Sequence, residues 1–226
     1  MKKLAVLAPA LIAAMGMASV AEARSYEVTV TNLTYGQVLT PPVVISHRAS
    51  FNVFHAGDAA SSELKTLAET GNPMPLAESV IGSSAVRDVS TGTDVIPPGH
   101  SMTVTVDATG LAKISVMSML ATTNDAFIAI QGESIPFYGS REYYAPVWDA
   151  GTEANTELCD DIPGPPCGGA SNMEVTDGAE GFIHIHRGFH GINEAAGDTG
   201  NGSGEGLTAS RFDWRGPAAK ITIVAK

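Results

Sequence analysis

Two short acidic segments of the chain carry residue types that can bind a hard cation. One segment, Thr-Thr-Asn-Asp, ends at Asp125, and residues 148–155 contain Asp149 and Glu153 on either side of Gly151. Calcium takes about 6–8 oxygen ligands from carboxylates, amides, backbone carbonyls and water. A loop curled around Gly151 could direct two carboxylates to one point, and Asp125 could join them if both segments share one end of a sheet. Ordinary solvated carboxylates are the alternative, because neither segment has the ligand spacing of an EF-hand.

A second candidate site is the histidine segment, defined here as residues 182–191, which contains His184, His186 and His190. In a strand, alternation places the first two imidazoles on one face, ~6.5–7 Å apart along the backbone. Their rings could converge on one zinc or copper ion, with His190 returning from the following turn as a third ligand. The alternative is a polar sheet face whose histidines bond to loop carboxylates or to the backbone.

The sequence lacks the common catalytic motifs. It contains no G-x-S-x-G elbow, no H-E-x-x-H and no phosphate-binding G-x-x-x-x-G-K. Asp149 and Glu153 could be imagined as the acid and base of a glycosidase, but a shared calcium ion explains them better. We therefore expect a binding protein and not an enzyme.

Composition and charge exclude several classes of protein. The chain has 226 residues, of which 13 are Lys or Arg and 24 are Asp or Glu, giving a formal net charge of −11. This balance repels phosphate backbones, so we expect no nucleic-acid partner. With 44% hydrophobic and 16% charged residues, the chain is far from the composition of disordered proteins.

The first 23 residues have the pattern of a secretory signal peptide. Lys2 and Lys3 precede an uncharged run at residues 4–20, and Ala21-Glu22-Ala23 supplies a small-x-small cleavage pattern. The run is rich in alanine and contains Pro9, so it is a poor membrane anchor. No later stretch is long and apolar enough to span a membrane, and we expect a secreted or periplasmic product.

Export places the two cysteines, Cys159 and Cys167, in an oxidising compartment. The segment between them is rich in proline and therefore suited to turning. We expect a disulfide bond, which would contribute roughly 2–3 kcal/mol by closing a short loop. Free thiols open to copper or redox chemistry are the alternative, but the chain has no redox motif. Two cysteines also exclude a disulfide-dense scaffold and a four-cysteine zinc site.

Alternating apolar and polar residues predict that the chain after residue 23 is mostly β-strand. Turn residues separate the strands, which is typical of an antiparallel β-sandwich. We therefore expect one all-β domain over residues 24–226. The expected strands lie near residues 26–31, 43–47, 102–106, 114–119, 126–130, 182–187 and 221–223.

One helix is expected to interrupt the strands. Ser61 or Ser62 can cap a segment whose Leu64 and Leu67 share a face, and Gly71 ends it. Residues 193–206 are rich in glycine and acidic residues without periodicity, which predicts a surface loop.

Three segments resemble the spondin domain, the N-terminal module shared by F-spondin and mindin and found in many bacterial secreted proteins. Residues 144–153, Tyr-Ala-Pro-Val-Trp-Asp-Ala-Gly-Thr-Glu, are similar to the W-D-A-G-T-D segment of that family. Residues 118–127 resemble its S-x-L-x-x-S-P-D-W stretch. Residues 47–57 and 64–71 resemble its early H-x-x-F segment and its helix ending L-A-E-x-G. The resemblance extends from Tyr26 to the C-terminus.

The resemblance implies a β-sandwich akin to calcium/phospholipid-binding modules and one Ca²⁺ ion held by three carboxylates. Carried over by position, these ligands are Asp125, Asp149 and Glu153. Two positions depart from the pattern: Ala126-Phe127 replace a tryptophan, and Glu153 replaces an aspartate, which lengthens one ligand by a methylene. Animal members act in matrix adhesion, which implies binding to an extracellular or envelope protein or glycan. The histidine segment is not implied by the resemblance, and its zinc or copper site remains the alternative.

Overall fold

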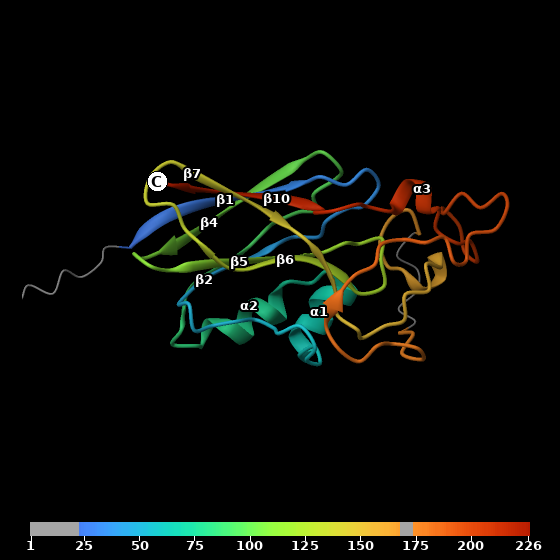
Figure 1. Cartoon of the computed structure of the whole chain (residues 1–226), viewed down its shortest axis with the longest axis horizontal. Coiled ribbons are helices and arrows are strands. Elements are labelled where there is room, and N and C mark those ends of the chain that lie inside the picture. The colour runs from blue at the N-terminus through green and yellow to red at the C-terminus, as the bar shows by residue number, and fades with distance from the viewer. Residues whose placement is uncertain (1–22, 168–173) are drawn as a thin grey trace, which may run out of the picture.

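The computed structural model describes residues 23–167 and 174–226. Within them, the strands form two antiparallel sheets that face each other, which confirms the predicted all-β sandwich (Figure 1). The four-stranded sheet has the order β4-β1-β10-β7, and the six-stranded sheet has the order β3-β2-β5-β6-β8-β9. The predicted signal segment, apart from its last residue, lies outside the described residues, and β1 begins at Arg24.

The four-stranded sheet is built from strands with one buried face. In β1 (Arg24–Asn32), the side chains of Tyr26, Val28 and Val30 point into the core, and the residues between them are partly exposed. This period of two is the pattern of a half-buried strand. The other strands of the sheet are β4 (Ser101–Ala108), β7 (Ser140–Ala145) and β10 (Ala219–Ala225).

The six-stranded sheet is buried on both faces at its centre. Every residue of β2 (Val43–His47) is buried, and in β5 (Lys113–Met119) every residue after Lys113 is buried. One face packs against the other sheet, and helices α1 and α2 cover the other (Figure 1). The remaining strands are β3 (Val86–Thr91), β6 (Ala126–Ser134), β8 (Val147–Asp149) and β9 (His184–Ile185).

The predicted helix is confirmed as α1 (Ser62–Thr70). The side chain of Ser61 accepts a hydrogen bond from the Leu64 amide, and Gly71 ends the helix in the left-handed conformation. The expectation of one helix was wrong, because the described chain also forms α2 (Met74–Ile81), α3 (Ala209–Phe212) and the 3-10 turn η1 (Cys159–Asp161). The apolar residues of α2 lie against the outer face of the sheet, and this tertiary packing stabilises a helix too short to form alone.

The strand predictions differ from the structure in two ways. The sequence predicted no strand for β3, β7 or β8, and it predicted a longer strand at residues 182–187 than the two residues of β9. The chain leaves β9 at His186, although the His186 amide still donates to the carbonyl of Val147. Residues 193–206 contain no helix or strand, apart from the isolated bridge between Leu158 and Gly206.

A third, smaller core lies at the end of the sandwich that carries η1 and α3. The predicted disulfide between Cys159 and Cys167 is confirmed, and Cys159 packs there among buried apolar side chains. These side chains are Ile162, Phe189, Leu207 and Phe212. This core supports the long irregular segments between β8 and β10. Among the described residues, no helix is both long and apolar enough to cross a membrane.

Candidate metal centre

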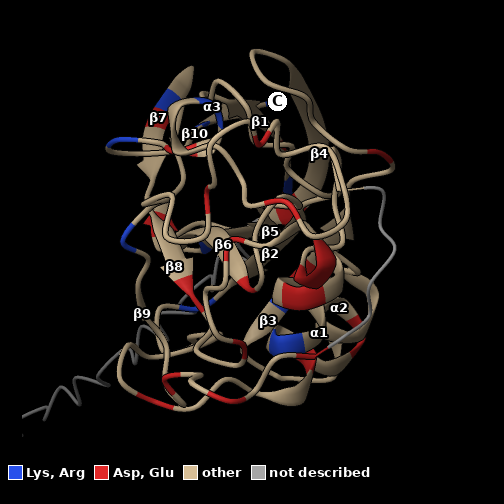
Figure 2. Ribbon diagram, turned by 90° about the vertical axis from the view of Figure 1, so that its right-hand side faces the viewer, with Lys and Arg blue, Asp and Glu red and all other residues tan. Residues whose placement is uncertain are grey.

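The two acidic loops, residues 122–125 and 148–155, lie side by side at one end of the sandwich. Ala126, the first residue of β6, pairs with Asp149, the last residue of β8. The amide of Ala150 donates to the carbonyl of Asp125 at 3.2 Å. Acidic residues are frequent on the loops at this end, onto which Figure 2 looks. The condition on which Asp125 could join Asp149 and Glu153, that both loops share one end of a sheet, is therefore met.

Asp125 is a buried carboxylate whose two oxygens differ in their hydrogen bonding. Oδ2 accepts hydrogen bonds from the Thr152 amide at 2.7 Å, the Thr152 hydroxyl at 3.2 Å and the Glu153 amide at 3.1 Å. Oδ1 is buried and has no hydrogen-bond partner. Burial and then the charge of Asp149 raise the pKa of Asp125 to about 7, although the three donors oppose this. The side chain is thus fixed in orientation with one uncompensated oxygen.

Glu153 is also buried beside other acids. Burial raises the pKa of Glu153 to about 8, and the charges of Glu69, Asp125 and Glu174 add to the effect. Lys65 is a base near this group, and it forms ion pairs with Glu69 at 3.5 Å and with Glu174. The acidic side of the site therefore holds more negative charge than this lysine can neutralise.

Asp149 lies between the acidic loops and the histidine segment. Its carboxylate is fully buried, and burial raises its pKa. Oδ1 accepts a hydrogen bond from the Gly151 amide at 2.8 Å, and Oδ2 accepts one from Asn155 Nδ2 at 2.8 Å. Each oxygen also faces a histidine: Oδ1 lies 3.6 Å from Nε2 of His184, and Oδ2 lies 3.8 Å from Nε2 of His186.

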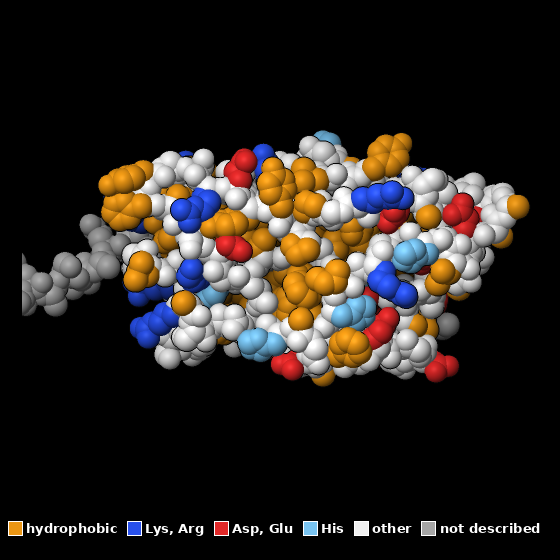
Figure 3. All heavy atoms as spheres, viewed as in Figure 1, with side chains coloured by type: hydrophobic (Ala, Val, Ile, Leu, Met, Phe, Trp, Pro, Cys, Tyr) orange, Lys and Arg blue, Asp and Glu red, His pale blue; other side chains and the backbone are white. Residues whose placement is uncertain are grey.

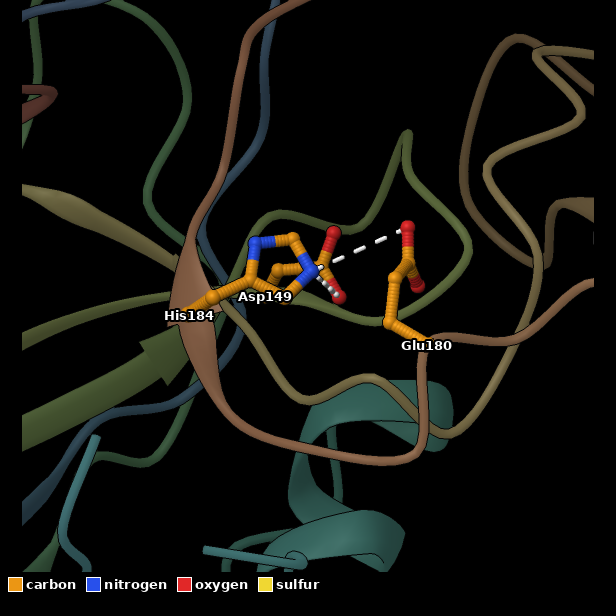
Figure 4. A group of neighbouring side chains, drawn as sticks. All are labelled: Asp149, Glu180 and His184. Atoms are coloured by element: carbon orange, nitrogen blue, oxygen red, sulfur yellow. Dashed lines mark ion pairs between the residues drawn. The ribbon is translucent and has the colours of Figure 1, made fainter. Parts of the chain in front are cut away.

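Figure 4 shows Asp149, Glu180 and His184 converging from β8, the segment before β9 and β9 itself. Nε2 of His184 lies 3.7 Å from Oε1 of Glu180 and has no hydrogen-bond partner, although it is buried. Nδ1 of the same ring donates to the carbonyl of Ile185 at 3.0 Å. In the neutral ring this contact leaves the lone pair on Nε2, facing the two carboxylates.

The other two histidines of the segment play different parts. His186 is buried, with Nε2 donating to Oδ1 of Asn155 at 2.9 Å and Nδ1 accepting from the Gly188 amide at 2.9 Å. Burial lowers the pKa of His186 to about 3, so the ring is neutral and both its nitrogens are occupied. His190 is exposed, and its amide donates to Glu157 at 2.7 Å.

The described residues hold one group of three metal-ligating side chains whose ligand atoms all lie within 4.8 Å of one another. It consists of Asp149, Glu180 and His184. The structure brings neither the three histidines nor the three predicted calcium ligands together this closely. Sequence reasoning did not place Glu180 in a metal-ligating group, and the only local signal for it is its position four residues before His184.

Gly151 fixes the histidine segment against the second acidic loop. Its φ is +67°, and a Cβ at this position would lie 2.7 Å from the amide nitrogen of Phe182 and closer still to its carbonyl oxygen. The carbonyl of Gly151 accepts a hydrogen bond from the Gly181 amide at 2.8 Å. Only glycine permits both the left-handed backbone and this close approach.

An apolar groove of about 640 Å³ lies beside His186. Tyr144, Ile185 and Trp214 contribute to its walls, together with the guanidinium-bearing Arg187 and Arg215. Hydrophobic side chains gather in the middle of the face seen in Figure 3, with histidines near them. The groove is separate from the carboxylate cluster and contains no acid among its lining residues.

Comparison with known proteins matches this architecture to a family. The family model described as Spondin_N matches residues 24–168, which include both acidic loops and all strands from β1 to β8. The matched range ends before Glu180 and the histidine segment, whereas the sequence resemblance was expected to reach the C-terminus. Among curated proteins, no sequence matches the chain. The chain belongs to the spondin N-terminal domain family.

Proposed function

We propose that this protein is an exported calcium-binding β-sandwich module that acts in adhesion or surface binding and not in catalysis. The observation that carries the proposal is Asp125, a buried carboxylate with one oxygen fixed by three donors and the other without a partner. An unpartnered buried carboxylate oxygen is costly unless a cation or donor completes it.

The donor set around Asp125 fits calcium. Asp125, Asp149 and Glu153 offer only oxygen atoms, and hard divalent cations prefer such ligands. Burial raises the pKa of all three groups, and neighbouring acidic charges add to the effect, so a divalent cation would offset the repulsion. Backbone carbonyls and water would complete the coordination shell.

The family supports a binding role. Spondin N-terminal domains are extracellular, non-catalytic modules, and the disulfide is typical of oxidising compartments. A calcium ion would tie two acidic loops that otherwise repel each other, and the loops would then present a fixed surface. The proposed partner is an extracellular or envelope protein or glycan. The proposed export signal is the segment at residues 1–23.

The first experiment is elemental analysis of the purified protein together with thermal unfolding in chelator, calcium and magnesium. We expect near-stoichiometric calcium. At a calcium concentration of about 100 times the Kd, binding adds roughly 2.7 kcal/mol of stability, which raises Tm by about 5–10 °C. The Asp125→Asn and Glu153→Gln variants are expected to lose this gain.

The matched control is Asp177→Asn, which removes an exposed carboxylate near the site and should leave the calcium response unchanged. The proposal is wrong if calcium leaves Tm unchanged, or if Asp125→Asn responds to calcium as strongly as the unmodified protein does.

A further inference from the structure

We propose that Asp149, Glu180 and His184 bind one Zn²⁺ ion, with a fourth coordination position open to water. This site differs from the proposed calcium site in two of its three ligands and does not depend on it. The two sites share Asp149, and the experiments below separate them.

The spacing of the three ligand atoms suits a small tetrahedral ion. Zinc bonds to imidazole nitrogen and carboxylate oxygen are about 2.0–2.2 Å long, which places neighbouring tetrahedral ligand atoms about 3.3–3.6 Å apart. Nε2 of His184 lies 3.6 Å from Oδ1 of Asp149 and 3.7 Å from Oε1 of Glu180. These two distances are within a few tenths of an ångström of that range, and the third pair, between Asp149 and Glu180, lies within 4.8 Å. The first two distances are also too long for direct hydrogen bonds.

The bonding of the His184 ring prepares it as a ligand. Nδ1 donates to the carbonyl of Ile185, so the neutral ring directs its free lone pair from Nε2 toward the two carboxylates. Metal-binding histidines commonly donate their other ring N–H to a carbonyl or carboxylate in this way. Both Nε2 of His184 and Oε2 of Glu180 are buried without a hydrogen-bond partner. A bound ion would compensate these atoms.

A chain of hydrogen bonds holds Asp149 in position for the ion. The Gly188 amide donates to His186 Nδ1, His186 Nε2 donates to Asn155 Oδ1, and Asn155 Nδ2 donates to Asp149 Oδ2. Such outer contacts orient ligating carboxylates and strengthen metal binding. His186 therefore acts as a positioning residue for Asp149, since neither of its nitrogens is free to bind the ion.

The ligand types favour zinc over calcium. Calcium and magnesium take oxygen ligands, whereas zinc accepts imidazole nitrogen together with carboxylate oxygen. Catalytic zinc sites use three protein ligands and leave the fourth position to water, and this group offers three. Glu180 and His184 lie beyond the residues matched by the family model, so the proposed zinc site adds to the matched module.

Zinc binding is tested on the protein purified without a histidine tag and stripped with chelator, by titration against a chromogenic competitor. We expect one zinc ion per chain and a four-coordinate visible spectrum with Co²⁺. His184→Ala and Glu180→Gln are each expected to raise the zinc Kd by at least about tenfold. Glu180→Gln changes a partly exposed side chain, so it tests the site even if His184→Ala fails to fold.

Two controls and the calcium variant make the test specific. His190→Ala and Glu78→Gln change exposed side chains of the same types and should leave zinc affinity unchanged. Asp125→Asn should lose calcium binding and keep zinc binding. The proposal is overturned if the protein binds less than half an equivalent of zinc. It is also overturned if His184→Ala and Glu180→Gln bind zinc as tightly as the unmodified protein, which would mean that a protonated His184 simply pairs with the two acids.

Discussion

The two sides of Asp149 are built from different chemistry. On one side, the acidic loops present oxygen atoms only, and Asp125 is held by three donors to a single oxygen. On the other side, Glu180 and His184 bring a mixed set that includes a free ring nitrogen. The oxygen side lies within the residues that match the spondin N-terminal domain model, and the histidine side lies outside them.

This difference shows that one buried carboxylate, Asp149, can belong to two neighbouring groups of potential metal ligands. Asp149 ends β8, and its two oxygens are fixed by separate donors, Gly151 and Asn155. A carboxylate fixed at both oxygens keeps its orientation whichever side binds an ion. Under the two proposals, the ligand types on each side would then select the ion, because oxygen sets favour calcium and imidazole favours zinc.

Replacing Gly151 by alanine should lower the stability of the protein and weaken metal binding on both sides of Asp149. It is the substitution with the largest expected effect. The new Cβ would meet the backbone of Phe182, and the residue would be strained at a φ of +67°. We expect a loss of about 2–4 kcal/mol in the free energy of unfolding, together with weaker binding of both metals. Chemical denaturation in chelator measures the first effect. Gly204→Ala, at a positive φ with open space around it, is the control for strain alone.

The pH dependence of stability should report on the acidic loops, because Asp125 and Glu153 have raised pKa values. The pKa values of Asp125 and Glu153 are raised to about 7 and about 8, from 3.8 and 4.5, so folding favours their protonated forms. Their contribution to stability is complete below about pH 4 and is lost as the pH rises through 7 to 8. In chelator, we expect Tm to fall by on the order of 5 °C between pH 5 and pH 8.5.

Saturating calcium should remove most of this fall in Tm, because the bound ion stabilises the charged carboxylates. Asp125→Asn in chelator should show a smaller fall than the unmodified protein. An unchanged pH profile in that variant would show that Asp125 is not the group that titrates.

Asn155→Ala should weaken zinc binding indirectly, because Asn155 positions Asp149 and is not itself a proposed ligand. The change removes the donor to Asp149 Oδ2 and leaves the buried N–H of His186 without its acceptor. We expect a cost of about 1–2 kcal/mol in stability and weaker zinc binding, measured by denaturation and by competitor titration. Alanine at the exposed Asn52 is the matched control. Equal effects of the two variants would argue against a role for the hydrogen-bond chain.

His190→Ala should have the smallest effect. The residue is exposed and lies outside the close group, although the sequence placed it with His184 and His186. We expect a stability change within about 0.5 kcal/mol and unchanged zinc affinity. A clear loss of zinc affinity would instead support the original set of three histidines.

The sequence predicted the parts of the fold that depend on local pattern. The alternation in β1 and the apolar run in β2 identified both strands, and Ser61 with Gly71 identified the ends of α1. It did not predict β7, whose residues are mostly exposed at a sheet edge and do not alternate clearly. Nor did it predict β8, which has only three residues and forms through its neighbours.

The sequence brought the loop before β6 and the loop after β8 together only on the condition that both lie at one end of a sheet, because β8 itself was not predicted. The contact between residues near Asp125 and Asp149 follows from the pairing of β6 with β8. The contact between Asp149 and Glu180 depends on the close approach of Gly151 to Phe182, across 31 positions without a repeated pattern. The strand alternation of His184 and His186 was correct in placing both rings near one point. It failed to show that the hydrogen bonds of His186 leave it without a free nitrogen.

The position of β10 has a consequence for the order in which the protein can assemble during synthesis. β10 lies between β1 and β7, and it is the only strand in the described sheet that β7 pairs with. It follows every other described strand in the sequence, so the four-stranded sheet stays split into β4-β1 and an unpaired β7 until residues 219–225 are made. The described sandwich therefore cannot be completed before β10, the last of the described strands in sequence order, has been made.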